Sequence, residues 1–376
     1  MAINSLDFYK ELIKNGVDFF SGVPDSLLKE LCLCIDENIS DDKHLIAANE
    51  GNAIALAAGH YLATKSTPVV YMQNSGIGNA INPLLSLCDE DVYAIPMLLI
   101  IGWRGEPGIK DEPQHLKQGK VQIELIKSLG IPYEILSSED DDYKTKIYKS
   151  IENARSKSSP TILLVKKGTF EKSINQKKNN QIDLMIREEA LKIILKNIDN
   201  DAVIVSTTGK TSREIFEIRE KNNDSHERDF LTVGSMGHCS SIALGIALAK
   251  PHRKVYCIDG DGSMLMHFGS MASIVSKKPQ NFRYILLNNE VHESVGGQET
   301  TAKYLNISAI IKAMGIKNVY TVKNKEMIYE NIDLFISSNG PSFLEVKIKP
   351  GSREDLGRPT IKPVKNKDSF INFLKD

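Results

Sequence analysis

The chain has 376 residues, 41% of them apolar and 25% charged, so it is too long for one hydrophobic core and about right for two. Its 47 Lys and Arg residues balance 48 Asp and Glu residues, which argues against nucleic acid and anionic membranes as partners. No apolar run reaches the roughly 18 residues of a membrane span, and charged residues interrupt the first twelve positions, where a signal peptide needs an apolar stretch. We therefore expect a cytoplasmic protein whose five cysteines are reduced and buried.

The first half alternates strand-like apolar runs with helical segments. A helix is expected from Asn4 or Ser5, followed by an Ala-rich helix at about 51–64 and a charged helix at 144–157. Strand-like runs occur at 17–22, 44–48, 68–72, 94–103 and 161–167. Near-continuous apolar strands that alternate with helices indicate a parallel sheet covered on both faces.

A polar stretch separates the two halves. Residues 168–183 show no apolar periodicity, which is typical of an exposed connection. The second half then repeats the alternation, with strand-like runs near 201–209, 229–237, 254–263, 281–289, 318–322 and 342–348. Helices are expected at 213–221, 242–249, from about 264 to 277, and at 307–314. The chain is thus predicted to be an α/β protein with two doubly wound parallel-sheet domains.

Two strand ends in the second half carry groups that suit a bound ion. A buried strand runs into Asp259-Gly260-Asp261-Gly262-Ser263, and the next strand ends at Asn288-Asn289. Ligands of parallel sheets bind beyond the carboxyl ends of the strands, where carboxylate and amide oxygens suit Mg²⁺ that holds a diphosphate. Either motif alone could be an ordinary turn or strand end. Together, at this spacing, they indicate a ligand site.

Other nucleotide sites fit less well. The segment GDGSML lacks the third glycine of a dinucleotide fingerprint, and Ile81 replaces that glycine after Gly76 and Gly78. The chain contains no GxxxxGK[ST] loop for a nucleoside triphosphate.

The GDGS motif, followed by a strand that ends in NN, resembles the thiamine diphosphate signature, and other segments resemble the phosphonopyruvate and sulfopyruvate decarboxylase family. GWRGEPG, KDEPQH and GSREDLGRPT resemble the phosphonopyruvate branch in particular. The resembling segments span nearly the whole chain: 21–28, 49–59, 73–84, 102–119, 207–214, 234–247, 260–270, 286–300 and 351–360.

The resemblance implies a domain order within the thiamine diphosphate-binding fold. Residues 1–170 would be the pyrimidine-binding domain, 171–184 a linker, and 185–376 the diphosphate-binding domain. Glu50 matches the glutamate that activates the coenzyme, although from the residues alone it could simply stabilise the start of a helix. Gly234 would accept a hydrogen bond from the aminopyrimidine through its carbonyl. Met236 would wedge the coenzyme into a bent shape, and its alternative role is core packing.

The resemblance also implies the residues that hold the diphosphate and its ion. Asp261, Asn289 and the carbonyl of Val291 match the Mg²⁺ ligands, although Asn288 adjoins Asn289 and leaves the choice within that pair open. Thr208, Gly260, Gly262 and Ser263, together with Asn289, would line the diphosphate.

A 2-keto acid that also bears a phosphonate needs cationic and donor groups. The candidates are Asp25, Ser26, Arg104, Lys110, His115, Arg353 and Arg358. We place Arg104, Lys110, His115 and Lys117 in one loop after a strand, and interpret Lys117 as solvated surface charge. Arginine matches tetrahedral oxyanions well. His115 and His292 are candidate proton carriers at neutral pH.

The resemblance implies decarboxylation of 3-phosphonopyruvate to phosphonoacetaldehyde and CO2 in phosphonate biosynthesis, with thiamine diphosphate and Mg²⁺. It also implies a homodimer or homotetramer with active sites between chains. One alternative is a sulfopyruvate decarboxylase that forms sulfoacetaldehyde; pyruvate decarboxylation and carboligation are more distant. A non-catalytic thiamine diphosphate-binding protein is the alternative of another class, against which the presence of Glu50, Asp261 and Asn289 argues.

Overall fold

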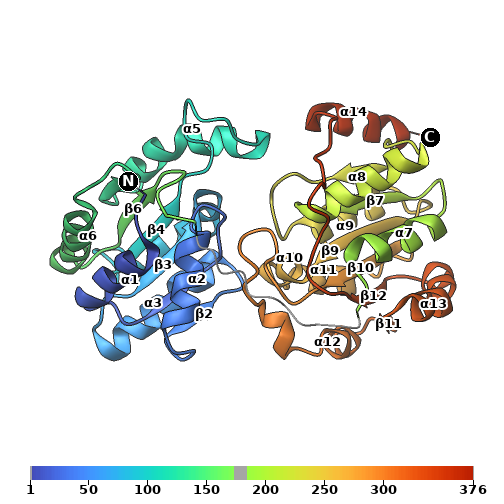
Figure 1. Ribbon diagram of the computed structural model, residues 1–376. Coiled ribbons are helices and arrows are strands. Elements are labelled where there is room, and N and C mark those ends of the chain that lie inside the picture. The colour runs from blue at the N-terminus through green and yellow to red at the C-terminus, as the bar shows by residue number, and fades with distance from the viewer. Residues whose placement is uncertain (1, 173–183, 376) are drawn as a thin grey trace. The chain divides into compact units, whose positions relative to one another are not determined.

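The computed structural model describes residues 2–172 and 184–375, which form two compact units (Figure 1). The units comprise Met1–Lys177 and Lys178–Asp376. Most of the predicted linker, 171–184, lies outside the described residues. Both units are built on parallel sheets, which confirms the predicted α/β fold class.

The first unit contains a six-stranded sheet in the order β2-β1-β3-β4-β6-β5, in which every pair is parallel. Its strands are β1 (Phe20–Gly22), β2 (His44–Ile46), β3 (Val69–Gln73), β4 (Leu98–Gly102), β5 (Tyr133–Leu136) and β6 (Thr161–Val165). Its helices are α1 (Ser5–Lys14), α2 (Lys29–Asn38), α3 (Glu50–Thr64), α4 (Ile77–Pro83), α5 (Pro113–Ser128) and α6 (Tyr143–Lys157), with short turns η1 (Asn74–Gly76) and η2 (Leu84–Cys88).

The second unit contains a six-stranded parallel sheet in the order β11-β12-β10-β9-β7-β8. Its strands are β7 (Val203–Ser206), β8 (Asp229–Leu231), β9 (Val255–Gly260), β10 (Phe282–Asn288), β11 (Asn318–Val322) and β12 (Ser342–Lys347). Its helices are α7 (Arg187–Asn197), α8 (Lys210–Asn222), α9 (Cys239–Ala249), α10 (Asp261–Met266), α11 (Ser270–Lys277), α12 (Ile307–Ala313), α13 (Lys325–Ser337) and α14 (Pro363–Phe373), with the turn η3 (Thr301–Tyr304).

Each sheet is buried on both faces, because alternate residues of one strand enter different hydrophobic clusters. On β4, Leu98 and Ile100 pack into one cluster, whereas Leu99 and Ile101 pack into the other. The second sheet shows the same division on every central strand. Side chains of successive strand residues point to opposite faces, so a strand covered on both sides has to be apolar throughout. This explains the continuous apolar runs of the sequence.

Three predictions about elements were wrong. His115 and Lys117 lie in the first turns of α5 rather than in a loop, because Pro113 supplies a favourable start to that helix. The edge strand β5 was missed, since its residues are only partly buried and form no long apolar run. The single helix expected to reach Lys277 is interrupted between α10 and α11.

Two further features agree with the sequence. The five cysteines are buried and free. None of the helices within the described residues combines the length and the apolar content needed to cross a bilayer.

Candidate active site

Glu50 lies buried at the first position of α3. The helix begins there because the side chain of Asn49 accepts a hydrogen bond from the backbone N–H of Asn52 at 2.9 Å, which caps the N-terminus of the helix. Glu50 is 5% exposed, and its Oε2 accepts a hydrogen bond from Nδ2 of Asn79 at 2.7 Å. Burial raises the pKa of Glu50, and the bond from Asn79 offsets this only in part. The Glu50 carboxyl group therefore binds its proton more tightly than a solvent-exposed glutamate does.

The turn η1 connects Glu50 with a second group of polar residues in the first unit. A Cβ added to Gly76 would lie 2.3 Å from Oε1 of Glu50, so the backbone of this turn rests directly on the carboxylate. Two residues earlier, the amide of Asn74 exchanges hydrogen bonds with the backbone of Arg104, at 2.9 and 3.2 Å. One three-residue turn thus separates the acid from the arginine.

Arg104 follows β4 and is held in a single orientation. Its Nε donates to Oδ2 of Asp111 at 2.8 Å, its Nη2 donates to Oδ1 of the same carboxylate, and its Nη1 donates to Oγ of Ser26 at 2.8 Å. Burial alone would raise the pKa of Asp111, but the hydrogen bond and charge of Arg104 contribute to lowering it to about 2. The pair is therefore ionised at neutral pH.

Asp25 and His115, both near Arg104, each have a buried polar atom for which the described residues offer no partner: Oδ1 of Asp25 and Nδ1 of His115. Burial raises the pKa of Asp25 to about 6, against the opposing charge of Arg104. Burial, together with the charge of Arg104, lowers the pKa of His115 to about 4 against the opposing charge of Asp111, so His115 is neutral at pH 7. A ligand bound beside Arg104 would find these two polar atoms without a hydrogen-bond partner in the described residues.

In the second unit, Asp261 and Asn289 meet at the ends of two neighbouring strands. Gly260 pairs with Leu287 in the sheet, so Asp261 after β9 and Asn289 after β10 emerge together. The backbone N–H of Asn289 donates to the Asp261 carboxylate, and the hydroxyl of Thr300 donates to its Oδ2. Asn288 instead donates to Glu345 at 2.9 Å, within the sheet. The geometry therefore favours Asn289 over Asn288 as a partner of Asp261.

The surroundings of Asp261 suit a divalent cation. Asp261 is 2% exposed, and within residues 2–172 and 184–375 no lysine or arginine forms an ion pair with it. Burial raises its pKa to about 6, and the charge of Glu290 acts in the same direction. A buried carboxylate without a cationic partner is unfavourable unless a cation or a proton neutralises it. The carboxylate oxygens of Asp261 and the amide oxygen of Asn289 are the kind of ligands that Mg²⁺ prefers.

Other predicted coenzyme residues gather around the same turn. A Cβ on Gly262 would lie 3.0 Å from the ring of His292 and 3.5 Å from Cε of Met236, so these three residues pack together. The hydroxyl of Ser263 accepts from the backbone of Gly237 at 3.1 Å, which ties the segment at 234–237 to the GDGS turn. His292 is partly buried, and the loss of solvation lowers the pKa of its imidazole to about 4. Thr208 donates to the carbonyl of Val233 at 2.8 Å.

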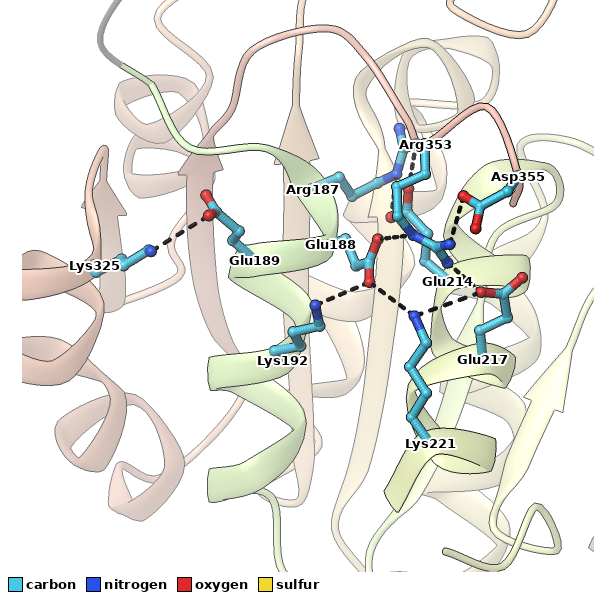
Figure 2. Close-up of polar contacts among 10 residues, drawn as sticks. All are labelled: Arg187, Glu188, Glu189, Lys192, Glu214, Glu217, Lys221, Lys325, Arg353 and Asp355. Carbon is cyan, nitrogen blue, oxygen red and sulfur yellow. Dashed lines mark hydrogen bonds and ion pairs between the residues drawn. The ribbon is translucent and has the colours of Figure 1, made fainter. Parts of the chain in front are cut away.

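Arg353, Lys110 and Arg358 are the remaining cations predicted to contact the substrate. Arg353 donates to Glu188 at 2.6 Å and to Asp355 at 2.7 Å, and it also contacts Glu217 (Figure 2). Three carboxylates thus already neutralise its guanidinium in the second unit. Lys110 and Arg358 are exposed.

Several residues at these sites escaped sequence reasoning. Asn74, Asn79, Asp111 and Thr300 all lie inside segments whose family resemblance was recognised, but none carries a distinctive motif by itself. Their roles depend on which strand ends lie side by side. Only the sheet order reveals that.

Two family models match this chain. The model described as "Thiamine pyrophosphate enzyme, N-terminal TPP binding domain" matches residues 7–126, and "Thiamine pyrophosphate enzyme, C-terminal TPP binding domain" matches residues 207–346. Thiamine pyrophosphate is another name for thiamine diphosphate. The matches cover the Glu50 region in the first unit and the Asp261 region in the second.

Curated relatives extend the similarity to the full length. The phosphonopyruvate decarboxylase of Streptomyces viridochromogenes is 32% identical over 99% of this chain and 95% of its own. The sulfopyruvate decarboxylase of Methanosarcina acetivorans is 29% identical over 93% of both chains. Sulfopyruvate decarboxylase subunit beta of Methanococcus maripaludis is 33% identical over 51% of this chain and 98% of its own. The chain therefore belongs to the phosphonopyruvate and sulfopyruvate decarboxylase family, and it is a thiamine diphosphate-dependent decarboxylase.

Proposed function

We propose that this chain decarboxylates 3-phosphonopyruvate to phosphonoacetaldehyde and CO2, with thiamine diphosphate and Mg²⁺, as a cytoplasmic step of phosphonate biosynthesis. The full-length similarity to a phosphonopyruvate decarboxylase supports this assignment. The observation that carries it is the fixed guanidinium of Arg104, which lies one short turn from Glu50.

Arg104 is prepared to receive an oxyanion. Its contacts to Asp111 and Ser26 use three of the five guanidinium N–H groups. Within the described residues, no hydrogen-bond acceptor is found for the other two, which leaves them for the substrate. Arginine in a fixed orientation recognises tetrahedral oxyanions more specifically than a mobile lysine does. Ser26, Asp25 and His115 surround it, and we propose that they complete the substrate site.

Each residue then has a defined task. When bound, thiamine diphosphate supplies a nucleophilic carbon and a sink for the electron pair that CO2 leaves behind. Glu50 would hold the coenzyme's pyrimidine through its buried carboxyl group, whose pKa burial raises. His115 and His292, both neutral at pH 7, can exchange a proton with the substrate. The buried setting limits water, which strengthens these polar contacts.

The second unit would hold the diphosphate. Asp261, Asn289 and the carbonyl of Val291 are the proposed Mg²⁺ ligands, because the first two meet at adjacent strand ends. Gly234 and Met236, with Thr208, Gly260, Gly262 and Ser263, would contact the coenzyme. Lys110, Arg353 and Arg358 remain predicted substrate contacts.

We further propose a homodimer or homotetramer, with each active site formed between chains. Glu50 belongs to the first unit, whereas Asp261 belongs to the second. One subunit of a relative corresponds to only about half of this chain, which fits a catalytic centre assembled from two parts.

Sulfopyruvate is the second candidate substrate, because a full-length sulfopyruvate decarboxylase is also similar. Initial rates with phosphonopyruvate, sulfopyruvate and pyruvate, measured side by side, decide between them. We expect the highest kcat/KM with phosphonopyruvate. A preference for pyruvate would refute the role given to Arg104.

The matched pair of variants is Arg104→Gln and Lys117→Gln, since both remove one positive charge and Lys117 is exposed on α5. Loss of charged hydrogen bonds should raise the KM for phosphonopyruvate about 10- to 100-fold in Arg104→Gln. Lys117→Gln should leave KM unchanged. Far-UV circular dichroism confirms that both variants are folded.

A further inference from the structure

The side chain of Asn289 is hydrogen-bonded to an acidic residue, Glu293, in the loop that follows β10. Its Nδ2 donates to Oε2 of Glu293 at 3.0 Å, and its Oδ1 accepts from the backbone of Val291 at 3.2 Å. Asn289 is 7% exposed, and the side chain of Glu293 is 12% exposed. The contact is therefore largely shielded from water.

The chemistry of this contact decides which end of the amide faces a cation. An ionised carboxylate can only accept hydrogen bonds, and an asparagine amide donates only through its nitrogen. Glu293 therefore fixes Nδ2 on its own side. The carbonyl oxygen of Asn289, which is the only end that can bind a metal ion, is turned away from Glu293 as a result. A flipped amide would place two acceptor oxygens against each other.

Glu293 is itself kept charged and immobile. Nη1 of Arg187 donates to its Oε2 at 2.8 Å, and Nζ of Lys210 donates to its Oε1 at 2.8 Å. Each oxygen of the Glu293 carboxylate therefore faces a positively charged side chain. Arg187 is 5% exposed and forms a two-fold hydrogen bond with Glu214, at 2.9 Å for each contact (Figure 2). The first residues of α7 and α8 thereby anchor the loop that carries Glu293.

We propose that Glu293 is a positioning residue that orients the Asn289 amide for Mg²⁺ and is fixed for that purpose by Arg187 and Lys210. The inference rests on the proposed Mg²⁺ site and not on the identity of the substrate. Residues behind metal ligands commonly contribute 10- to 100-fold to metal affinity by fixing the orientation of the ligand.

The experiment measures Mg²⁺ binding by calorimetry on the full chain with saturating thiamine diphosphate. Glu293→Gln should weaken Mg²⁺ binding about 10- to 100-fold, because the new amide no longer dictates the orientation of Asn289. Glu293→Asp keeps the charge on a shorter side chain, so its Mg²⁺ affinity should lie between those of Glu293→Gln and the original chain. Glu189→Gln is the matched control: it removes the same charge from the second unit, at an exposed ion pair with Lys325 (Figure 2).

A double-mutant cycle distinguishes an effect of Glu293 on the orientation of Asn289 from an effect of its negative charge alone. If Glu293 acts through Asn289, Glu293→Gln should change Mg²⁺ affinity less than about twofold in an Asn289→Ala background. A purely electrostatic contribution would persist there and would overturn the proposal. If Glu293→Gln fails to fold, Lys210→Met tests the same chain of contacts. Lys210 is partly exposed, and its loss should weaken Mg²⁺ binding about two- to fivefold, again only when Asn289 is present.

The positioning role of Glu293 and the proposed substrate can be refuted independently. If Glu293→Gln binds Mg²⁺ as tightly as the original chain does, Glu293 has no positioning role, whatever substrate the enzyme turns over. Coenzyme uptake without any divalent cation removes both the proposed Mg²⁺ site and this inference. Failure to decarboxylate phosphonopyruvate affects only the proposed function.

Discussion

The contact between Gly76 and Glu50 yields the sharpest prediction. Gly76 is buried with φ −74°, a conformation that alanine adopts without strain, so Gly76→Ala tests only the space beside the carboxylate. The added Cβ would lie 2.3 Å from Oε1 of Glu50 and 2.6 Å from its Cδ and Cγ, which is about 1 Å closer than ordinary contact at 3.4 Å. The Glu50 side chain therefore has to move by about 1 Å.

The expected effect on activity is larger than the effect on stability. Displacement of a catalytic group by about 1 Å can lower the rate about 100-fold, whereas overpacking of this kind costs about 1–3 kcal/mol. Steady-state kcat and the midpoint of chemical unfolding measure the two effects. Gly78→Ala is the control, because Gly78 lies two residues further on α4 with no atom within 4 Å of an added Cβ. If both variants keep full activity, the reasoning about the Glu50 environment is wrong.

Three further predictions concern charged groups of the first unit. Glu50→Gln should lower kcat by 100-fold or more while largely sparing coenzyme affinity, since Asn79 can still donate to it; unchanged kcat by stopped assay would contradict the assigned role. Asp111→Asn should destabilise the fold by about 1 kcal/mol at pH 7, after allowance for solvent screening, and raise the KM for phosphonopyruvate because Arg104 loses its two-point contact. The lowered pKa of Asp111 stabilises the fold above about pH 4, so urea unfolding should show this difference vanishing near pH 2. Asp25 has the opposite sign: burial raises its pKa from 3.8 to about 6, so the fold loses stability as pH rises from about 4 to about 6 and stays at the lower level above that. The stability of Asp25→Asn relative to the original chain should therefore increase by about 3 kcal/mol between pH 4 and pH 8, and a flat difference would refute the shift.

Much of the fold was predictable because the strands are apolar throughout. The run at 161–167 and the strand β6 (Thr161–Val165) nearly coincide, as do the charged helix at 144–157 and α6. A residue buried on both faces of a sheet has few alternatives to an aliphatic side chain, so such strands stand out in a sequence. The partly exposed strand β5 lacks this signal and was not recognised.

Motifs predicted part of the candidate site, and contacts supplied the rest. Asp261 and Asn289 were recognised because their types and spacing are unusual after strands. Asp111 and Glu293 were not, since surface carboxylates are common and only their partners, Arg104 and Asn289, distinguish them. Arg353 was predicted from its motif to contact the substrate; the structure adds its ion pairs with Glu188, Glu217 and Asp355, which the sequence did not reveal, and the substrate contact stays a prediction.

The amino-acid order alone determined the α/β class and pointed to the coenzyme, because both follow from short-range patterns: apolar runs of strand length and a few residues at fixed spacing. Tertiary structure alone decided which carboxylate clamps Arg104, which asparagine faces Asp261 and which glycine leaves room for Glu50. Those relations join residues that are distant in the chain and meet only when parallel strands align their carboxyl ends along one edge of a sheet.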